Sequence, residues 1–170
     1  ITHLPLIKKV AETKKPIIIS TGLASKKEIK EAVRVAKKNG CPKIILMKCT
    51  SAYPASISDS NLETIIDLKK TFKCDIGFSD HTKDILSSIV AVSMGATIIE
   101  KHVTFSRGLK GPDHKASSTL SEFKKLVKEI RKINLIKGSD KNIISDEEKE
   151  IANVSRKSIV ANKTLYEKHI

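Results

Sequence analysis

The sequence predicts an α/β fold, in which helices cover a parallel β-sheet. Short apolar segments of strand length alternate along the chain with longer segments whose apolar residues recur at helical spacing. Turn and capping residues, such as Pro16 and Asn39–Gly40, stand where one kind of segment gives way to the other. Strands that alternate with helices form parallel sheets, because parallel neighbours need a long crossover connection and a helix supplies it.

The first part of the chain predicts a lone helix and then two strand–helix units. In chain order these are a helix over 4–14, a strand over 17–19, a helix from Ser25 to Asn39–Gly40, a strand over 43–49 and a helix that begins at Asp59 or Ser60. Pro16 ends the first helix, because proline has no N–H to donate. Ser25 and Glu28 match a capping box, in which each side chain satisfies a free backbone N–H of the other.

The second part predicts two further units and then a change of character. In chain order these are a strand over 75–79, a helix over 85–94, a strand over 97–102 and, after a polar loop over 105–118, a helix over 120–135. Phe123, Leu126, Val127 and Ile130 form the apolar face of that last helix. After Gly138 we expect a short charged helix or linker at 146–150, and then a new strand over 155–161.

Four strand–helix units leave two architectures open. A doubly wound open sheet fits, and so does part of a (β/α)₈ barrel, which has eight strands and about 250 residues. Only four strands are visible in the 170 residues, and the helix at 4–14 has no strand before it. This pattern favours the second half of a barrel over residues 1–137. The chain starts with Ile1 rather than a methionine, so we expect it to be a piece of a longer protein.

Composition bears on the class of partner. The formal net charge is +13, which is typical of chains that bind nucleic acid. However, the lysines are spread along the expected helices, aromatic residues are only 4% and tryptophan is absent, so platforms for stacking bases are scarce. We therefore favour a solvated basic surface with no nucleic-acid partner, and a basic non-catalytic binding module stays as the alternative class.

Cysteine content and hydropathy bear on location. The three cysteines are an odd number without close pairing, which favours a reducing compartment. No apolar run approaches the roughly 20 residues that a membrane-spanning helix needs. We therefore expect a cytoplasmic protein without membrane contact.

Polar residues follow all four expected strands. The four strand ends are Ser20-Thr21-Gly22, Cys49-Thr50-Ser51-Ala52-Tyr53, Ser79-Asp80-His81-Thr82 and Glu100-Lys101-His102. In parallel α/β proteins the functional site lies at the carboxyl ends of the strands. We therefore expect these residues to share one rim.

Two of these strand ends carry a histidine. Side chains alternate along a strand, so Ser79 and His81 share a face, as do Glu100 and His102. Adjacent strands lie about 4.8 Å apart, so the two imidazoles can converge on one metal ion. Such a site suits Mn, Zn, Fe or Co with open positions for substrate, whereas a structural hydrogen bond is the alternative for each histidine.

The serines at the strand ends suggest two further chemistries. Ser20 and Ser79 precede helices, where hydroxyl and backbone N–H groups bind phosphate, although no nucleotide-binding glycine motif is present. Ser79 or Ser51 with His102 and Asp80 is the set that a hydrolase would use. The G-x-S-x-G nucleophile motif is absent, so we do not favour a hydrolase.

Five ordered blocks resemble the N-acetylneuraminate (sialic acid) synthase family, which includes the legionaminic and pseudaminic acid synthases. The blocks are KPIIISTGLAS, CTSAYPA, IGFSDHT, GATIIEKHVTF and GPDHKASSTLSEF. The resemblance implies a TIM-barrel transferase that condenses phosphoenolpyruvate with N-acetylmannosamine, or a related N-acetylated amino sugar, and water. The products would be a nine-carbon 2-keto acid and phosphate, released by C–O cleavage. It also implies a divalent metal, Mn²⁺ or Mg²⁺, and a homodimer of the full-length protein.

The resemblance assigns roles to eight residues. His81 and His102 match metal ligands, Ser20 and Ser79 match contacts to phosphoenolpyruvate, Tyr53, Ser51 and Asp113 match contacts to the sugar, and Glu100 stands near the metal in the matching motif. No other side chain nearby is an obvious general base, so Glu100 is our candidate for the catalytic residue. The sugar stays open, because CTSAYPA is closer to the pseudaminic members and GPDHKAS to the sialic and legionaminic members.

The resemblance also divides the chain. Residues 1–137 match the second half of the barrel, 138–154 are a linker, and SRKSIVANKTL resembles the opening of the family's small antifreeze-like (SAF) domain at 155–170. The family's first four strands, with the lysines that clamp phosphate, are missing. We therefore expect little or no activity from the 170 residues alone. A half-barrel that serves only as an interaction piece is the remaining alternative.

Overall fold

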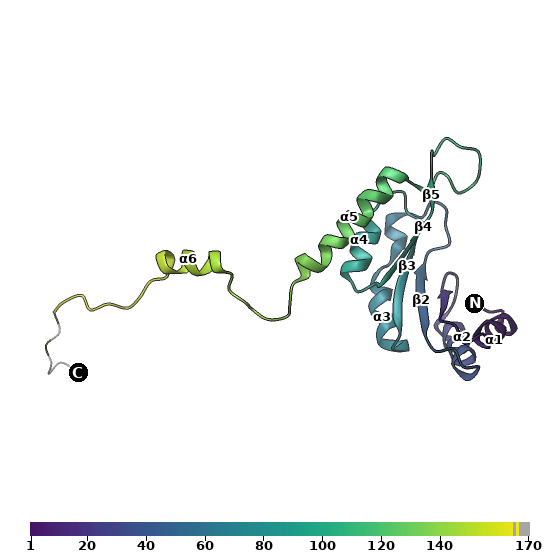
Figure 1. The fold of residues 1–170 in the computed structure, drawn as a ribbon, viewed down its shortest axis with the longest axis horizontal. Coiled ribbons are helices and arrows are strands. Elements are labelled where there is room, and N and C mark those ends of the chain that lie inside the picture. Colours follow the sequence, from purple (N-terminus) through teal and green to yellow (C-terminus); the bar gives the residue numbers. More distant parts are fainter. Residues whose placement is uncertain (165, 167–170) are drawn as a thin grey trace. The chain divides into compact units, whose positions relative to one another are not determined.

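A four-stranded parallel sheet organises residues 1–137 in the computed structural model, which describes residues 1–164 and 166 (Figure 1). The strands are β1 (Ile17–Ser20), β2 (Ile44–Cys49), β3 (Asp75–Asp80) and β4 (Ile98–Lys101). Each strand pairs in parallel with the next strand in the sequence, in the order β1-β2-β3-β4. A doubly wound sheet reverses its order at a switch point, whereas this order runs on in one direction. The predicted half-barrel sheet is therefore confirmed.

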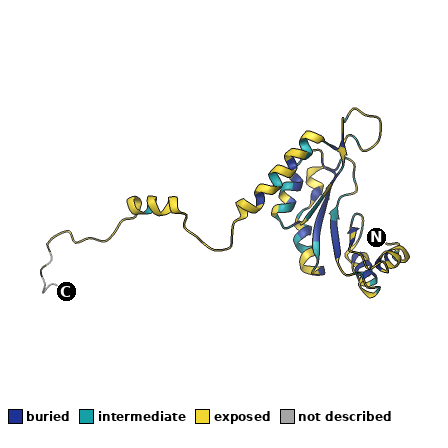
Figure 2. Ribbon diagram, viewed as in Figure 1, coloured by how far each residue is buried: buried dark blue, intermediate teal, exposed yellow. Residues whose placement is uncertain are grey.

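Helices pack on one face of this sheet. They are α1 (Leu4–Ala11), α2 (Lys26–Lys38), α3 (Glu63–Phe72) and α4 (Leu86–Ser93), and α5 (Leu120–Lys137) packs on α4. The strand residues on the helix side alternate with those on the other face. In β1, for example, Ile17 and Ile19 are buried while Ile18 is 54% exposed (Figure 2).

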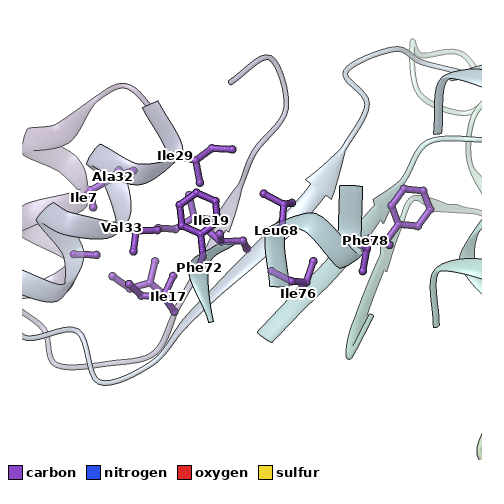
Figure 3. Close-up of a cluster of buried hydrophobic side chains, with 14 of the residues drawn as sticks. Ile7, Ile17, Ile19, Ile29, Ala32, Val33, Leu68, Phe72, Ile76 and Phe78 are labelled. Atoms are coloured by element: carbon purple, nitrogen blue, oxygen red, sulfur yellow. The ribbon is translucent and has the colours of Figure 1, made fainter. Parts of the chain in front are cut away.

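The core lies between the sheet and the helices. Figure 3 shows Ile17 and Ile19 of β1 among side chains of α1, α2 and α3, and Ile76 of β3 beside Leu68 of α3. Phe78 of β3 belongs to the same buried cluster. Removing this apolar surface from water is the main source of stability, at about 25 cal/mol per Å² buried. Phe78 belongs to this layer, as the alternation of side chains in β3 predicts.

The start of α2 shows how the sequence fixes an element. The Ser25 hydroxyl accepts a hydrogen bond from the Glu28 backbone N–H, and a Glu28 carboxylate oxygen accepts from the Ser25 N–H at 2.7 Å. The predicted capping box is therefore present. The buried face of α2 consists of Ile29, Ala32, Val33 and Ala36, which recur at helical spacing.

Three elements differ from the sequence predictions. Ile57–Ser60 forms a 3₁₀ turn, and α3 begins only at Glu63, because Asn61 has a left-handed backbone with φ of 41°. The polar loop over 105–118 is closed by a pair of short strands, β5 (Val103–Thr104) and β6 (Ser118–Thr119).

The third difference lies in the second compact unit, residues 138–170. Helix α6 (Asp146–Ser155) begins at a capping box of Ser145 and Glu148, and none of its residues is buried. The strand predicted over 155–161 is wrong: the described residues 156–164 form neither helix nor strand. A strand needs a neighbour to pair with, and the apolar Ile159 is fully exposed here. Among the described residues, no helix is long and apolar enough to cross a membrane.

Candidate functional site

The carboxyl ends of β3 and β4 bring four polar side chains together. The register pairs Ser79 with Glu100, and the Ser79 hydroxyl donates to the Glu100 carboxylate at 2.6 Å. One residue beyond the paired strands, the rings of His81 and His102 lie 5.3 Å apart between centroids, with 72° between their planes. The two histidines therefore lie side by side, as expected from their spacing.

The tautomer of His81 follows from its hydrogen bonds. Nδ1 lies 2.8 Å from the Thr50 carbonyl oxygen, which can only accept, so Nδ1 carries the proton. In the neutral ring, Nε2 then keeps its lone pair; it lies 3.3 Å from the Ser79 hydroxyl. The side chain is buried, so this orientation is fixed. A metal-bound histidine commonly has the same arrangement, with its other nitrogen donating to a backbone carbonyl.

Tyr53 completes an aromatic cluster with the two histidines. Its ring centroid is 4.1 Å from that of His81 and 5.6 Å from that of His102. The Tyr53 side chain remains half exposed, so it forms a wall that solutes can reach. Burial, followed by the nearby charges of Cys49, Asp113 and Glu100, raises the pKa of the Tyr53 hydroxyl. The hydroxyl is therefore a neutral donor at physiological pH.

The loop over 105–117 carries Asp113 to the same cluster. An Asp113 carboxylate oxygen lies 3.8 Å from Nδ1 of His102, beyond hydrogen-bonding distance. Arg107 holds this loop by a two-pronged ion pair with Glu122, at 2.7 and 3.0 Å, and by a bond to the Ser117 carbonyl. The loop is therefore anchored to the start of α5.

Ser20 and Ser51 lie at the same edge of the sheet but apart from the cluster. Ser20 ends β1, and its hydroxyl accepts weakly from the Gly22 N–H at 3.4 Å. Ser51 follows β2 and approaches Gly22 so closely that a Cβ there would lie 2.6 Å from the serine oxygen. Among the contacts of the described residues, none joins either serine to a histidine. The structure thus brings six of the eight predicted residues together and leaves these two beside them.

Asp80 takes no part in the cluster. Its carboxylate faces the helix side of the sheet and binds Lys101, Ser88 and Thr82. Among the contacts of the described residues, none joins its carboxylate to either imidazole, so the Ser-His-Asp arrangement of a hydrolase is not formed with this residue.

Sequence reasoning missed two groups beside His81. The Thr50 carbonyl fixes its tautomer, and the Cys49 sulfur lies 3.9 Å from its Nδ1. The register of β2 on β3, which pairs Cys49 with Ser79, is the signal that points to the cysteine. The loop backbone at Thr50 has no periodic pattern that reveals its direction.

The donor set suits a metal ion with open coordination positions. Among the described residues, no group of three or more His, Cys, Asp or Glu side chains is arranged to hold a metal ion. The two adjacent imidazoles, with the His81 lone pair left free, fit as two ligands. Any metal bound here takes its remaining ligands from water, substrate or groups beyond this cluster.

Comparisons with known proteins give a consistent assignment. Residues 1–142 match the sequence model of the NeuB family. N,N'-diacetyllegionaminic acid synthase from Campylobacter jejuni subsp. jejuni serotype O:2 is 45% identical over 167 residues, which are 97% of this chain and 50% of that protein. Pseudaminic acid synthase from C. jejuni serotype O:23/36 is 36% identical over 160 residues, 94% of this chain and 46% of that protein.

A solved structure agrees with these sequence matches. The crystal structure of N-acetylneuraminic acid (sialic acid) synthetase from Leptospira borgpetersenii, in complex with citrate, superposes with a TM-score of 0.80 at 39% sequence identity. The match covers 89% of this chain and 53% of that one. The chain therefore spans about half the length of the relatives it matches.

Proposed function

The chain belongs to the NeuB family, and from this premise we propose that it carries half of the active site of a nonulosonic acid synthase. The reaction condenses phosphoenolpyruvate with an N-acetylated amino sugar and water, and yields a nine-carbon 2-keto acid and phosphate. One observation carries the proposal: His81 and His102 lie side by side at the strand ends, with the Ser79–Glu100 pair directly beneath them.

Each residue of the cluster has a role that its position supports. His81 and His102 would hold a divalent ion, Mn²⁺ or Mg²⁺, which would supply Lewis acidity toward the aldehyde oxygen of the sugar. The Glu100 carboxylate accepts a hydrogen bond from the Ser79 hydroxyl at 2.6 Å. In the reaction it acts as the proton acceptor for the water that enters. Ser20 donates to an oxygen of phosphoenolpyruvate, and Ser79 does the same once its single hydroxyl proton turns from Glu100 to the substrate.

The sugar meets the outer part of the site. Tyr53 is half exposed and presents a neutral hydroxyl, and Asp113 lies at the end of an anchored loop. Both can hydrogen-bond the hydroxyl and acetamido groups of a sugar, and Ser51 stands at the same edge. The sequence motifs leave N-acetylmannosamine and related N-acetylated amino sugars open as the acceptor. The higher identity to a legionaminic acid synthase than to a pseudaminic acid synthase favours a diacetamido sugar among them.

A chimera tests the proposal, because the chain spans only half of its relatives. This chain replaces the segment that it matches in the C. jejuni legionaminic acid synthase. We expect phosphate release from phosphoenolpyruvate only when sugar and Mn²⁺ are both present, and turnover with each candidate sugar identifies the acceptor. EDTA should abolish the release and added Mn²⁺ should restore it.

Variants locate the chemistry in this chain. His81→Ala and His102→Ala should each remove metal-dependent turnover from the chimera. His3→Ala is the matched control: His3 is exposed at the start of α1, where its ring accepts the Leu6 N–H, so turnover should not change. A folded chimera without sugar-dependent phosphate release, or one indifferent to both site substitutions, would contradict the proposal.

Two further predictions complete the proposal. The full-length protein forms a homodimer, which sedimentation of that protein would test. Residues 155–170 begin an SAF domain; part of this span, residues 165 and 167–170, lies outside the described residues.

A further inference from the structure

The ends of β3 and β4 are also joined on the face away from the histidines. Lys101 Nζ lies 3.0 Å from an Asp80 carboxylate oxygen, and both side chains are 0% exposed. The register sets these two residues directly opposite each other. The next residue of each segment is a histidine, His81 or His102. The buried pair is therefore one residue away from each candidate ligand.

Both side chains of this pair make further hydrogen bonds to Thr82 or Ser88. One Asp80 oxygen accepts from the Thr82 backbone N–H at 2.8 Å and from the Thr82 hydroxyl at 2.7 Å. The other oxygen accepts from the Ser88 hydroxyl at 2.6 Å. Lys101 also donates to the Thr82 carbonyl at 2.8 Å. The bonds thus tie the end of β3, the turn after it, α4 and the end of β4 to one another.

Such a pair contributes more to geometry than to net stability. Burying two charges costs free energy that their attraction only partly returns, and apolar residues of similar volume often stabilise a core as well or better. Directional bonds, in contrast, allow only one register and one turn conformation. The turn that Asp80 fixes includes His81 itself, because Thr82 follows it.

We propose that Asp80 and Lys101 are positioning residues for the histidine pair. They hold the ends of β3 and β4 at one spacing and one register, so that both imidazoles face the same point. The inference rests on the proposed function for the identity of what binds there, but the positioning itself is a property of this chain.

Amide hydrogen exchange on the 170-residue chain tests the positioning without metal or activity. Asp80→Leu combined with Lys101→Met removes both charges and keeps apolar volume. We expect exchange about tenfold faster over 79–82 and 101–103, with unchanged rates in β1 and β2, because only the strand ends lose their tie. Unchanged rates at the strand ends, or a uniform acceleration over the whole sheet, would overturn the proposal.

The opposite end of the sheet offers a matched control. Lys43 and Asp75 also form an ion pair between neighbouring strand segments, at 2.7 Å, but their side chains are about half exposed. Lys43→Met combined with Asp75→Leu should leave exchange over 79–82 and 101–103 as in the wild type. The same acceleration in this control would also overturn the proposal.

A milder substitution guards against a double variant that fails to fold. Ser88→Ala removes only the hydroxyl that donates to Asp80 and leaves the ion pair in place. It should speed exchange over 79–82 about threefold, with the same thermal unfolding midpoint. A Ser88→Ala chain with wild-type exchange at these positions would contradict the proposal.

Metal affinity gives a second readout. Free Mn²⁺, followed by electron paramagnetic resonance, should report affinity about tenfold weaker in the double variant than in the wild type. Two imidazoles that are no longer aligned cannot both bind the same ion well. Equal affinities would contradict the positioning role. A wild-type chain without Mn²⁺ binding at the imidazoles would contradict the proposed function instead, and the exchange rates would still decide the positioning.

Discussion

The ends of β3 and β4 carry polar residues on both faces, and the two faces differ in how those residues are bonded. On the helix side, Asp80 and Lys101 are fully buried and bonded to each other and their neighbours. On the other side, Glu100 is exposed, the His102 side chain is partly exposed, and Nε2 of His81 keeps a lone pair. A buried network whose polar groups all bond to one another holds the backbone in place. A cluster with accessible polar groups and an unused lone pair can bind a ligand.

Removing one partner of the buried Asp80–Lys101 pair on the helix side should produce the largest loss of stability. Asp80→Ala leaves the Lys101 ammonium buried without its counter-ion, which should cost about 3–5 kcal/mol of unfolding free energy. Urea unfolding of the 170-residue chain measures it. Asp75→Ala, at the exposed pair with Lys43, is the control and should cost less than about 1 kcal/mol. Equal losses in the two variants would show that burial does not separate these pairs.

Removing a carboxylate from the open face should instead affect the rate. Glu100→Gln keeps the shape of the side chain but removes the proton acceptor. In the chimera we expect kcat to fall by about 10²- to 10⁴-fold. The unfolding free energy should stay within about 0.5 kcal/mol, because the side chain is exposed. Full turnover by the variant would remove Glu100 from the chemistry.

Acid should loosen the loop beside the open face by a smaller amount. The Thr119 backbone N–H and the Arg107 guanidinium lower the pKa of Glu122, against an opposing effect of burial. Because the folded pKa is the lower one, the stabilisation is present above the unfolded pKa of about 4.3 and is lost as pH falls through the folded value. Both side chains are 37% exposed, so solvent screening keeps it below about 1 kcal/mol.

Urea unfolding of the wild type and Glu122→Gln at pH 7 and pH 3 measures this contribution. The difference between the two proteins should shrink at the lower pH, as the carboxyl of the wild type becomes neutral. A difference that is the same at both pH values would mean that the ion pair adds nothing.

Much of the fold could be predicted because its signals are local. The capping box at Ser25 and the alternation of buried and exposed residues in β1 are both readable from neighbouring residues. The start of α3 was not, because a single left-handed residue, Asn61, interrupts the pattern. The prediction of a strand over 155–161 was wrong, because pairing with a neighbouring strand, rather than composition alone, decides whether such a segment becomes a strand.

The candidate site divides in the same way. Strand spacing and alternation suffice to bring His81 beside His102 and to turn Asp80 away. The contacts from the loop after β2, the Thr50 carbonyl and the Tyr53 ring, depend on a backbone path that has no period. Loop contacts of this kind can be predicted only once the strands are in place.

Metal binding by the two histidines is the central claim, and pulsed electron paramagnetic resonance of Mn²⁺ bound to the 170-residue chain tests it most directly. We expect hyperfine couplings from two imidazole nitrogens in the wild type. One coupling should remain in His81→Ala and one in His102→Ala, both with weaker affinity. Couplings that neither substitution alters, or Mn²⁺ bound without any imidazole, would contradict the assignment of His81 and His102 as a shared metal site.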